Sequence, residues 1–246
     1  MSEHGHRDHQ HGDQQHMVHE HRDLGGGTAR ATVFGISDGL VSNVALVLGV
    51  AAAGTTPSTV LLAGVSGLLA GAASMAAGEY VSVKAQTELV ERELEIERAS
   101  IAEKPELETT ELAAIYRSRG IEPEHAQAMA SAVMADPEVA LEVHAREELG
   151  VDPDSIGNPL GAAVSSFVAF AVGAALPLVP YVFAGGVVAA VISVVIGAVA
   201  AFAVGAALAY FTERSKIRSG LRQVALATAA CVLTVGIGSL LGATVV

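Results

Sequence analysis

The chain has 246 residues, of which 51% are hydrophobic and only 4% aromatic, and its formal net charge is −12 at pH 7. This acidic balance argues against nucleic-acid binding, which needs a basic surface, and the single cysteine, Cys231, excludes an intramolecular disulfide. The N-terminal region is polar rather than an apolar stretch behind a basic start, so we expect no cleavable signal peptide.

Residues 1–27 form a low-complexity segment that is rich in histidine and ends in three glycines. We expect a disordered tail and a flexible joint. The tail either binds metal weakly or is simply solvated, and the sequence leaves both alternatives open. Its histidines are His4, His6, His9, His11, His16, His19 and His21.

Five apolar segments follow, each close to or above the roughly 20 residues that a helix needs to cross a bilayer. They cover residues 31–53, 58–83, 158–179, 185–211 and 221–245. The sequence therefore predicts an all-α membrane protein with five transmembrane helices. Pro177 and Pro180 are expected to mark the connection between the third and fourth helices.

A charged segment separates the second apolar segment from the third. Residues 84–158 hold 18 acidic and 7 basic side chains, a local net charge of −11. Pro105, Gly120 and Pro137 divide this segment into short stretches of helical character. The predicted domains are a tail at 1–27, transmembrane helices 1–2 in 28–83, an acidic helical metal-binding domain at 84–157, and transmembrane helices 3–5 in 158–246.

The distribution of basic side chains predicts the orientation of the chain. Arg214, Lys216, Arg218 and Arg222 surround the last connection between apolar segments, whereas the connections at 54–58 and 177–184 carry no charge. Because basic loops stay in the cytoplasm, we expect the N-terminus and the acidic insert to be cytoplasmic and the C-terminus to lie outside. The expected location is the cell membrane, where the chain is a multi-pass protein in contact with the lipid bilayer.

Two of the apolar segments carry groups that can bind a cation. Asp38 lies in the first segment, and Met75 and Glu79 lie one helical turn apart in the second. A carboxylate inside the bilayer costs about 3 kcal/mol on insertion scales, so it usually faces a bundle interior, a water-filled path or a cation. The sequence favours a cation path, although a helix cap at Asp38, a packing role for Met75 and an interfacial position for Glu79 stay open.

The acidic insert contains further candidate metal ligands at helical spacing. Carboxylates prefer hard cations, and histidine extends this preference to iron, manganese and zinc. The alternative is a solvated acidic face, which is the usual meaning of a charge run. Glu93 and Glu97 share another helix face and are not among these candidates. The candidate ligands of the insert are Glu88, Glu91, Glu95, Glu108, Glu111, His144, Glu147 and Glu148.

The sequence offers only weak support for an enzyme. Di-iron carboxylate proteins use two Glu-x-x-His motifs, and the chain has one such spacing, from Glu122 to His125, interrupted by Pro123. No nucleotide-binding fingerprint or catalytic triad stands out. We therefore expect no enzyme and no tightly bound cofactor. A membrane-anchored di-iron ferroxidase or iron-storage protein stays as the alternative.

Three motifs resemble the vacuolar iron transporter family. They are FGISDGLVSN at 34–43, SMAAGEYVSVKAQ at 74–86, and HAREELG at 144–150. The similarity covers nearly everything after Arg30. The His-rich tail is not part of the family pattern.

The resemblance implies a homodimer with five membrane helices per subunit and a cytoplasmic three-helix metal-binding domain between helices 2 and 3. It also implies export of Fe²⁺, and often of Mn²⁺, from the cytoplasm in exchange for protons. Asp38 and Met75 match positions that line the path between subunits, and Glu79 matches the acidic position one turn further on. The glutamates of the insert match the metal-collecting residues as a group. Plant members use methionine near the position of His144, so the coordination chemistry is expected to differ.

Overall fold

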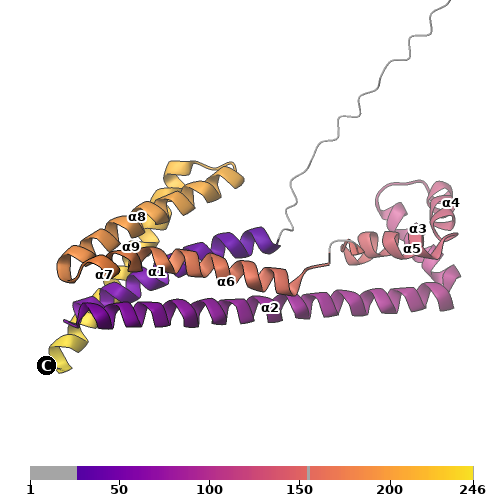
Figure 1. Ribbon diagram of the computed structural model, residues 1–246. Coiled ribbons are helices and arrows are strands. Elements are labelled where there is room, and N and C mark those ends of the chain that lie inside the picture. The colour runs from indigo at the N-terminus through magenta and orange to yellow at the C-terminus, as the bar shows by residue number, and fades with distance from the viewer. Residues whose placement is uncertain (1–26, 154–155, 246) are drawn as a thin grey trace, which may run out of the picture.

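The computed structural model describes residues 27–153 and 156–245, and the elements in these ranges are helical (Figure 1). The predicted His-rich tail lies outside the described residues except for Gly27. The elements are α1 (Gly27–Ala52), α2 (Pro57–Glu103), α3 (Pro105–Ser118), α4 (Pro123–Val133), α5 (Pro137–His144), the π-helical turn η1 (Ala145–Leu149), α6 (Pro159–Ala175), the 3₁₀ turn η3 (Leu176–Leu178), α7 (Val179–Phe183), α8 (Gly186–Phe211) and α9 (Lys216–Val245).

Among the described residues, five helical segments are long and apolar enough to cross a membrane. They are Thr32–Ala52, Pro57–Glu103, Pro159–Phe183, Gly186–Tyr210 and Lys216–Gly242. The prediction of an all-α membrane protein with five such helices is confirmed. The third segment extends past Pro177 and Pro180, because these prolines bend it through η3 into α7 instead of ending it.

Proline begins each helix from α2 to α6. Pro57, Pro105, Pro123, Pro137 and Pro159 occupy the first helical position, where the missing N–H would have no partner inside the helix and the fixed φ suits it. Pro105 and Pro137 were expected to divide the insert into separate helices. They do separate helices, and they do so as the first residues of the next one.

Helix α2 is continuous from the apolar bundle into the insert. The apolar segment 58–83 and the start of the charged segment were expected to be separate elements, but they form one helix of 47 residues. No glycine or proline interrupts the chain between residues 79 and 103, so nothing breaks the helix when its environment changes from apolar to polar. At about 1.5 Å per residue it is about 70 Å long. Its C-terminal half extends beyond the other long helices and carries α3, α4 and α5 at its end (Figure 1).

Helix α1 forms the centre of the apolar bundle, between α2 and α6 on one side and α8 and α9 on the other. Leu40, Val44 and Val47 are buried on it. Its crossing with α6 depends on close backbone approach: a methyl group added to Gly39 would lie 2.2 Å from the carbonyl oxygen of Phe170. Such small residues let membrane helices pack where no hydrophobic effect draws them together.

The long helices alternate in direction. The start of α1, the insert and the turn between α8 and α9 lie toward one end of the bundle, and the C-terminus lies toward the other (Figure 1). This arrangement is what an odd number of crossings requires.

We expect Gly39→Ala to destabilise the bundle, because the new methyl group meets backbone that cannot move aside cheaply. Overpacking of this kind costs about 1–3 kcal/mol, so the apparent Tm of the detergent-solubilised protein should fall by about 5 °C. Gly78→Ala on α2 is the matched control, since its methyl group would meet nothing within 4 Å. An equal loss of Tm in both variants would contradict the proposed packing.

Candidate functional site

A cavity of about 370 Å³ lies between three of the long helices, and it contains the predicted pair of membrane donors. Its lining residues are Asp38, Ser42, Asn43 and Leu46 from α1, Gly67, Gly71, Ser74 and Met75 from α2, and Phe170 from α6. Gly67 and Gly71 of α2 leave the space open. A methyl group on Gly67 would lie 2.5 Å from the Leu46 side chain, and one on Gly71 would lie 2.3 Å from the Phe170 ring. The cavity therefore combines a hard carboxylate with a soft thioether.

The three membrane candidates differ in their surroundings. Asp38 is exposed on the single chain, and Met75 is half-buried. Glu79 is also half-buried, and its Oε1 is buried with no hydrogen-bond partner among the described residues. Glu79 does not line the cavity that holds Asp38 and Met75. It follows Met75 by one turn of α2, on the side toward the insert.

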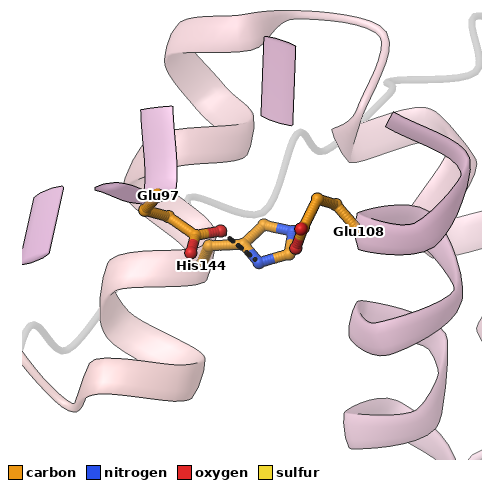
Figure 2. A group of neighbouring side chains, drawn as sticks. All are labelled: Glu97, Glu108 and His144. Carbon is orange, nitrogen blue, oxygen red and sulfur yellow. Dashed lines mark ion pairs between the residues drawn. The ribbon is translucent and has the colours of Figure 1, made fainter. Parts of the chain in front are cut away.

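A second cluster of donors lies in the insert, where Glu97 of α2, Glu108 of α3 and His144 of α5 converge (Figure 2). One donor atom from each lies within 4.8 Å of the other two. Glu97 Oε1 is 3.0 Å from His144 Nδ1, and His144 is fully buried. Transition metals bind such atoms at about 2.1 Å, which places opposite ligands about 4.2 Å apart. Small side-chain shifts would therefore bring all three onto one ion.

Helical periodicity brings these polar residues into the core of the insert. Glu97 follows Leu94 by three residues and precedes Ile101 by four, so it lies on the buried face of α2. His144 lies in the same way beyond Leu141 on α5. Each of these residues occupies a position where the pattern calls for an apolar side chain. Three short helices packed on the end of α2 are thus enough to assemble the cluster.

The electrostatics of the cluster favour a cation. Burial raises the pKa of the Glu108 carboxyl above its ordinary value, and the negative charge of nearby Glu111 raises it further, while His144 opposes both. In His144, Nε2 has no hydrogen-bond partner within the described part of the chain. Two buried carboxyls beside an imidazole are costly to ionise without a partner, and a divalent ion would supply that partner.

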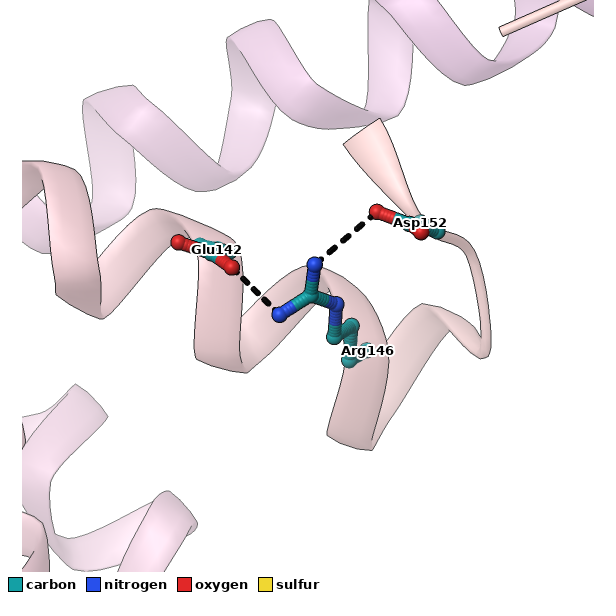
Figure 3. A network of polar contacts seen from close by, with 3 residues as sticks. All are labelled: Glu142, Arg146 and Asp152. Atoms are coloured by element: carbon teal, nitrogen blue, oxygen red, sulfur yellow. Dashed lines mark hydrogen bonds and ion pairs between the residues drawn. The ribbon is translucent and has the colours of Figure 1, made fainter. Parts of the chain in front are cut away.

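Ion pairs hold the end of α5 in place. Arg146 contacts Glu142 and lies 3.1 Å from Asp152, which ties α5 to the segment beyond η1 (Figure 3). Arg119, just after α3, pairs with Glu147. Gly150 then ends the π-helical turn in the left-handed region, with φ of 66°, which glycine adopts without a steric cost. These contacts hold the chain just before and just after His144.

The structure brings together some of the predicted insert ligands and separates others. Glu108 and His144 belong to the cluster, Glu148 Oε2 lies 3.6 Å from His144 Nδ1, and Glu111 acts on Glu108 through its charge. The remaining candidates lie outside the cluster: Glu91 and Glu95 are exposed, Glu88 pairs with Lys84 at 3.4 Å, and Glu147 pairs with Arg119.

Glu97 is the cluster residue that the sequence analysis did not select. The available signal was its place in the stripe that contains Leu94 and Ile101, because a carboxylate at an apolar position of a helix needs a partner.

The comparisons with known proteins agree with these features. The model of the VIT family matches residues 29–239. Vacuolar iron transporter 1 of Eucalyptus grandis is 32% identical over 214 residues, which cover 85% of this chain and 86% of that protein. Vacuolar iron transporter 1 of Arabidopsis thaliana is 34% identical over 195 residues, 79% of this chain and 78% of that protein. The vacuolar iron transporter of Acanthamoeba castellanii is 35% identical over 220 residues, which cover 87% of this chain and 78% of that protein.

The fold and the sites thus define a class of protein. It is a helical membrane protein that carries donor groups both between its long helices and in a polar insert. The chain belongs to the VIT family. The resemblance found from the three motifs is confirmed. The names of the relatives are those of transporters, which bears out the prediction that the chain is not an enzyme.

We expect Glu108→Gln to stabilise the metal-free protein at neutral pH. The raised pKa means that the folded state favours the protonated carboxyl, so this contribution to stability is complete below the ordinary value of 4.5 and is lost as pH rises through the higher folded-state pKa. A neutral amide removes that loss, and the Tm without metal should rise by about 2 °C. The gain should disappear at pH 4.

The same variant should respond less to metal. Mn²⁺, or Fe²⁺ without oxygen, should raise the Tm of the wild-type protein and raise that of Glu108→Gln much less, because binding to the folded state stabilises it. Glu124→Gln, which changes an exposed carboxylate of α4, should behave as wild type. If metal raised the Tm of all three proteins equally, the cluster would not be a metal site, and the insert would be a solvated acidic face.

Proposed function

We propose that the chain exports Fe²⁺ from the cytoplasm across the membrane in exchange for protons, with Mn²⁺ as a second cargo. The observation that carries this proposal is the cavity between α1, α2 and α6, which holds the carboxylate of Asp38 and the thioether of Met75. The names of the relatives support iron as the cargo. The protein would serve iron homeostasis.

Asp38 would couple the two fluxes, because one carboxylate binds either a proton or a cation. Met75 would add a softer ligand and so favour Fe²⁺ over Mg²⁺ and Ca²⁺. Glu79, one turn closer to the insert, would pass the ion toward the cavity. Its buried Oε1 without a hydrogen-bond partner among the described residues supports this role.

The insert would collect the ion before it enters the membrane. Glu97, Glu108 and His144 would form the centre of this metal-binding domain, with Glu111 and Glu148 beside them. Carboxylate and imidazole ligands suit Fe²⁺, Mn²⁺ and Zn²⁺ alike. Metal competes with protons for these groups, so binding should weaken as the pH falls.

A homodimer would complete the path. Asp38 lies at an exposed position of the single chain, and a second copy facing it would remove both carboxylates from lipid. The first helices of the two subunits would then lie side by side, with paired Asp38 residues on a shared path.

The basic residues near the start of α9 support the proposed orientation of the chain. The turn between α8 and α9 lies toward the same end of the bundle as the insert (Figure 1), and Arg214, Arg218 and Arg222 lie in this turn or in the first two turns of α9, which supports a cytoplasmic location for both. We propose the cell membrane as the site of action, with residues 84–157 as a cytoplasmic domain and the C-terminus outside.

A membrane-anchored di-iron ferroxidase or iron-storage protein is the competing proposal. The cluster of Glu97, Glu108 and His144 offers two carboxylates and one imidazole, which suits one ion better than a bridged pair that draws on four helices. The ferroxidase predicts oxygen consumption when Fe²⁺ is added, and the transporter predicts metal flux across a sealed bilayer without oxygen.

In proteoliposomes with a pH gradient, we expect Asp38→Ala to reduce anaerobic Fe²⁺ uptake at least about ten-fold, since the group that exchanges metal for protons is gone. Glu124→Ala should transport as wild type. If Asp38→Ala moves Fe²⁺ as fast as wild type, the proposed path is wrong. Oxygen consumption by the wild-type protein without any flux would support the ferroxidase.

Reporter fusions test the orientation. A fusion in the turn at Gly54 and one after Val246 should both report the outside, and a fusion in the insert after Gly120 should report the cytoplasm, because basic residues keep the insert side inside. Gly120 has a φ of 91° in an open turn, so an insertion there should be tolerated. A cytoplasmic C-terminus would require an even number of crossings and would contradict the predicted five.

A further inference from the structure

Asn43 is a buried polar residue in the wall of the Asp38–Met75 cavity. Its side chain is 2% exposed, and its Nδ2 donates a hydrogen bond of 2.6 Å to the backbone oxygen of Ala174 on α6. The opposite amide orientation would place two acceptor oxygens against each other. The contact with Ala174 therefore fixes which way the amide group points.

The other end of the amide has no partner. Asn43 Oδ1 is buried and lacks a hydrogen bond within the described part of the chain, whereas buried acceptors in proteins are nearly always satisfied. It faces α2, because a methyl group added to Gly67 would lie 3.3 Å from it. Asn43 and Gly67 both line the cavity. A buried acceptor thus stands beside an open space that also contains a carboxylate and a thioether.

We propose that Asn43 Oδ1 is a ligand of the cation that occupies this cavity, together with Asp38 and Met75. The proposal rests on the proposed function and adds a specificity-determining residue to it. An amide oxygen is a hard, neutral donor that suits Fe²⁺ and, more strongly, Mn²⁺. It does not titrate, so it continues to hold the ion while the Asp38 carboxylate exchanges metal for a proton.

The alternative is a purely structural role, in which Asn43 only ties α1 to α6 through Ala174. The two roles differ for Asn43→Asp, because a carboxylate supplies an oxygen to the cavity but presents no amide donor to Ala174. A ligand role predicts that Asn43→Asp works better than Asn43→Leu. A structural role predicts that it works no better.

The test measures KM and maximal rate for Fe²⁺ and Mn²⁺ in proteoliposomes under a pH gradient. Asn43→Leu should raise KM for Mn²⁺ about ten-fold and KM for Fe²⁺ only about three-fold, because Met75 still favours the softer ion. Asn43→Asp should keep KM for Mn²⁺ within about three-fold of wild type. Gly67→Ala, whose methyl group would lie 3.3 Å from Oδ1 and 2.5 Å from the Leu46 side chain, should also shift the ratio of the two KM values. Gly78→Ala is the control.

Equal losses for both metals in Asn43→Leu, with Asn43→Asp no better, would overturn the proposal. A wild-type protein that moves no metal would instead defeat the proposed function. In that case Mn²⁺ binding to the solubilised full chain decides the question, on a background in which Glu97→Gln, Glu108→Gln and His144→Gln remove the insert cluster. Loss of the remaining Mn²⁺ binding on adding Asn43→Leu supports the ligand, and unchanged binding overturns it.

Discussion

A carboxylate that leaves water must acquire a proton, a cation or strong hydrogen bonds, and this constraint applies both in the insert and in the apolar bundle. In the insert, Glu97 and Glu108 are buried beside His144. In the bundle, Asp38 belongs to a helix that is apolar enough to cross a membrane. Neither arrangement is the cheapest way to fill its position, since an apolar residue would stabilise the metal-free protein more. Their presence is explained if a cation completes them.

The rigid connection between the two sites is helix α2. Met75 and Glu97 are separated by 22 residues of uninterrupted helix, which at about 1.5 Å per residue is about 33 Å along the axis. A continuous helix holds the insert at a fixed distance from the cavity and presents Glu79 between them. On the proposed function, the ion therefore crosses a defined gap instead of depending on a flexible linker.

The sequence predicted the elements well and the cluster only in part. Long apolar runs and prolines marked the helices because these signals are local. The continuity of α2 was missed, since a change from apolar to charged residues looks like a boundary although no residue breaks the helix there. In the insert, the surface glutamates Glu91 and Glu95 were as conspicuous as Glu108, because spacing along one helix does not reveal which face other helices cover. Glu97 had a signal in its own helix, the apolar stripe of Leu94 and Ile101, but its partners, like those of Asn43, emerge only from contacts between helices.

The two sites must also bind without trapping the ion, because transport needs release at every step. In the cluster, the same burial and like charge that raise the pKa of Glu108 also let protons compete for it. In the cavity, each chain contributes one carboxylate, that of Asp38, and the neutral donors of Met75 and Asn43 would supply the remaining contacts. On the proposed function, the ion must leave the carboxylates of the insert, which costs electrostatic attraction, and its exchange for protons at Asp38 would offset that cost.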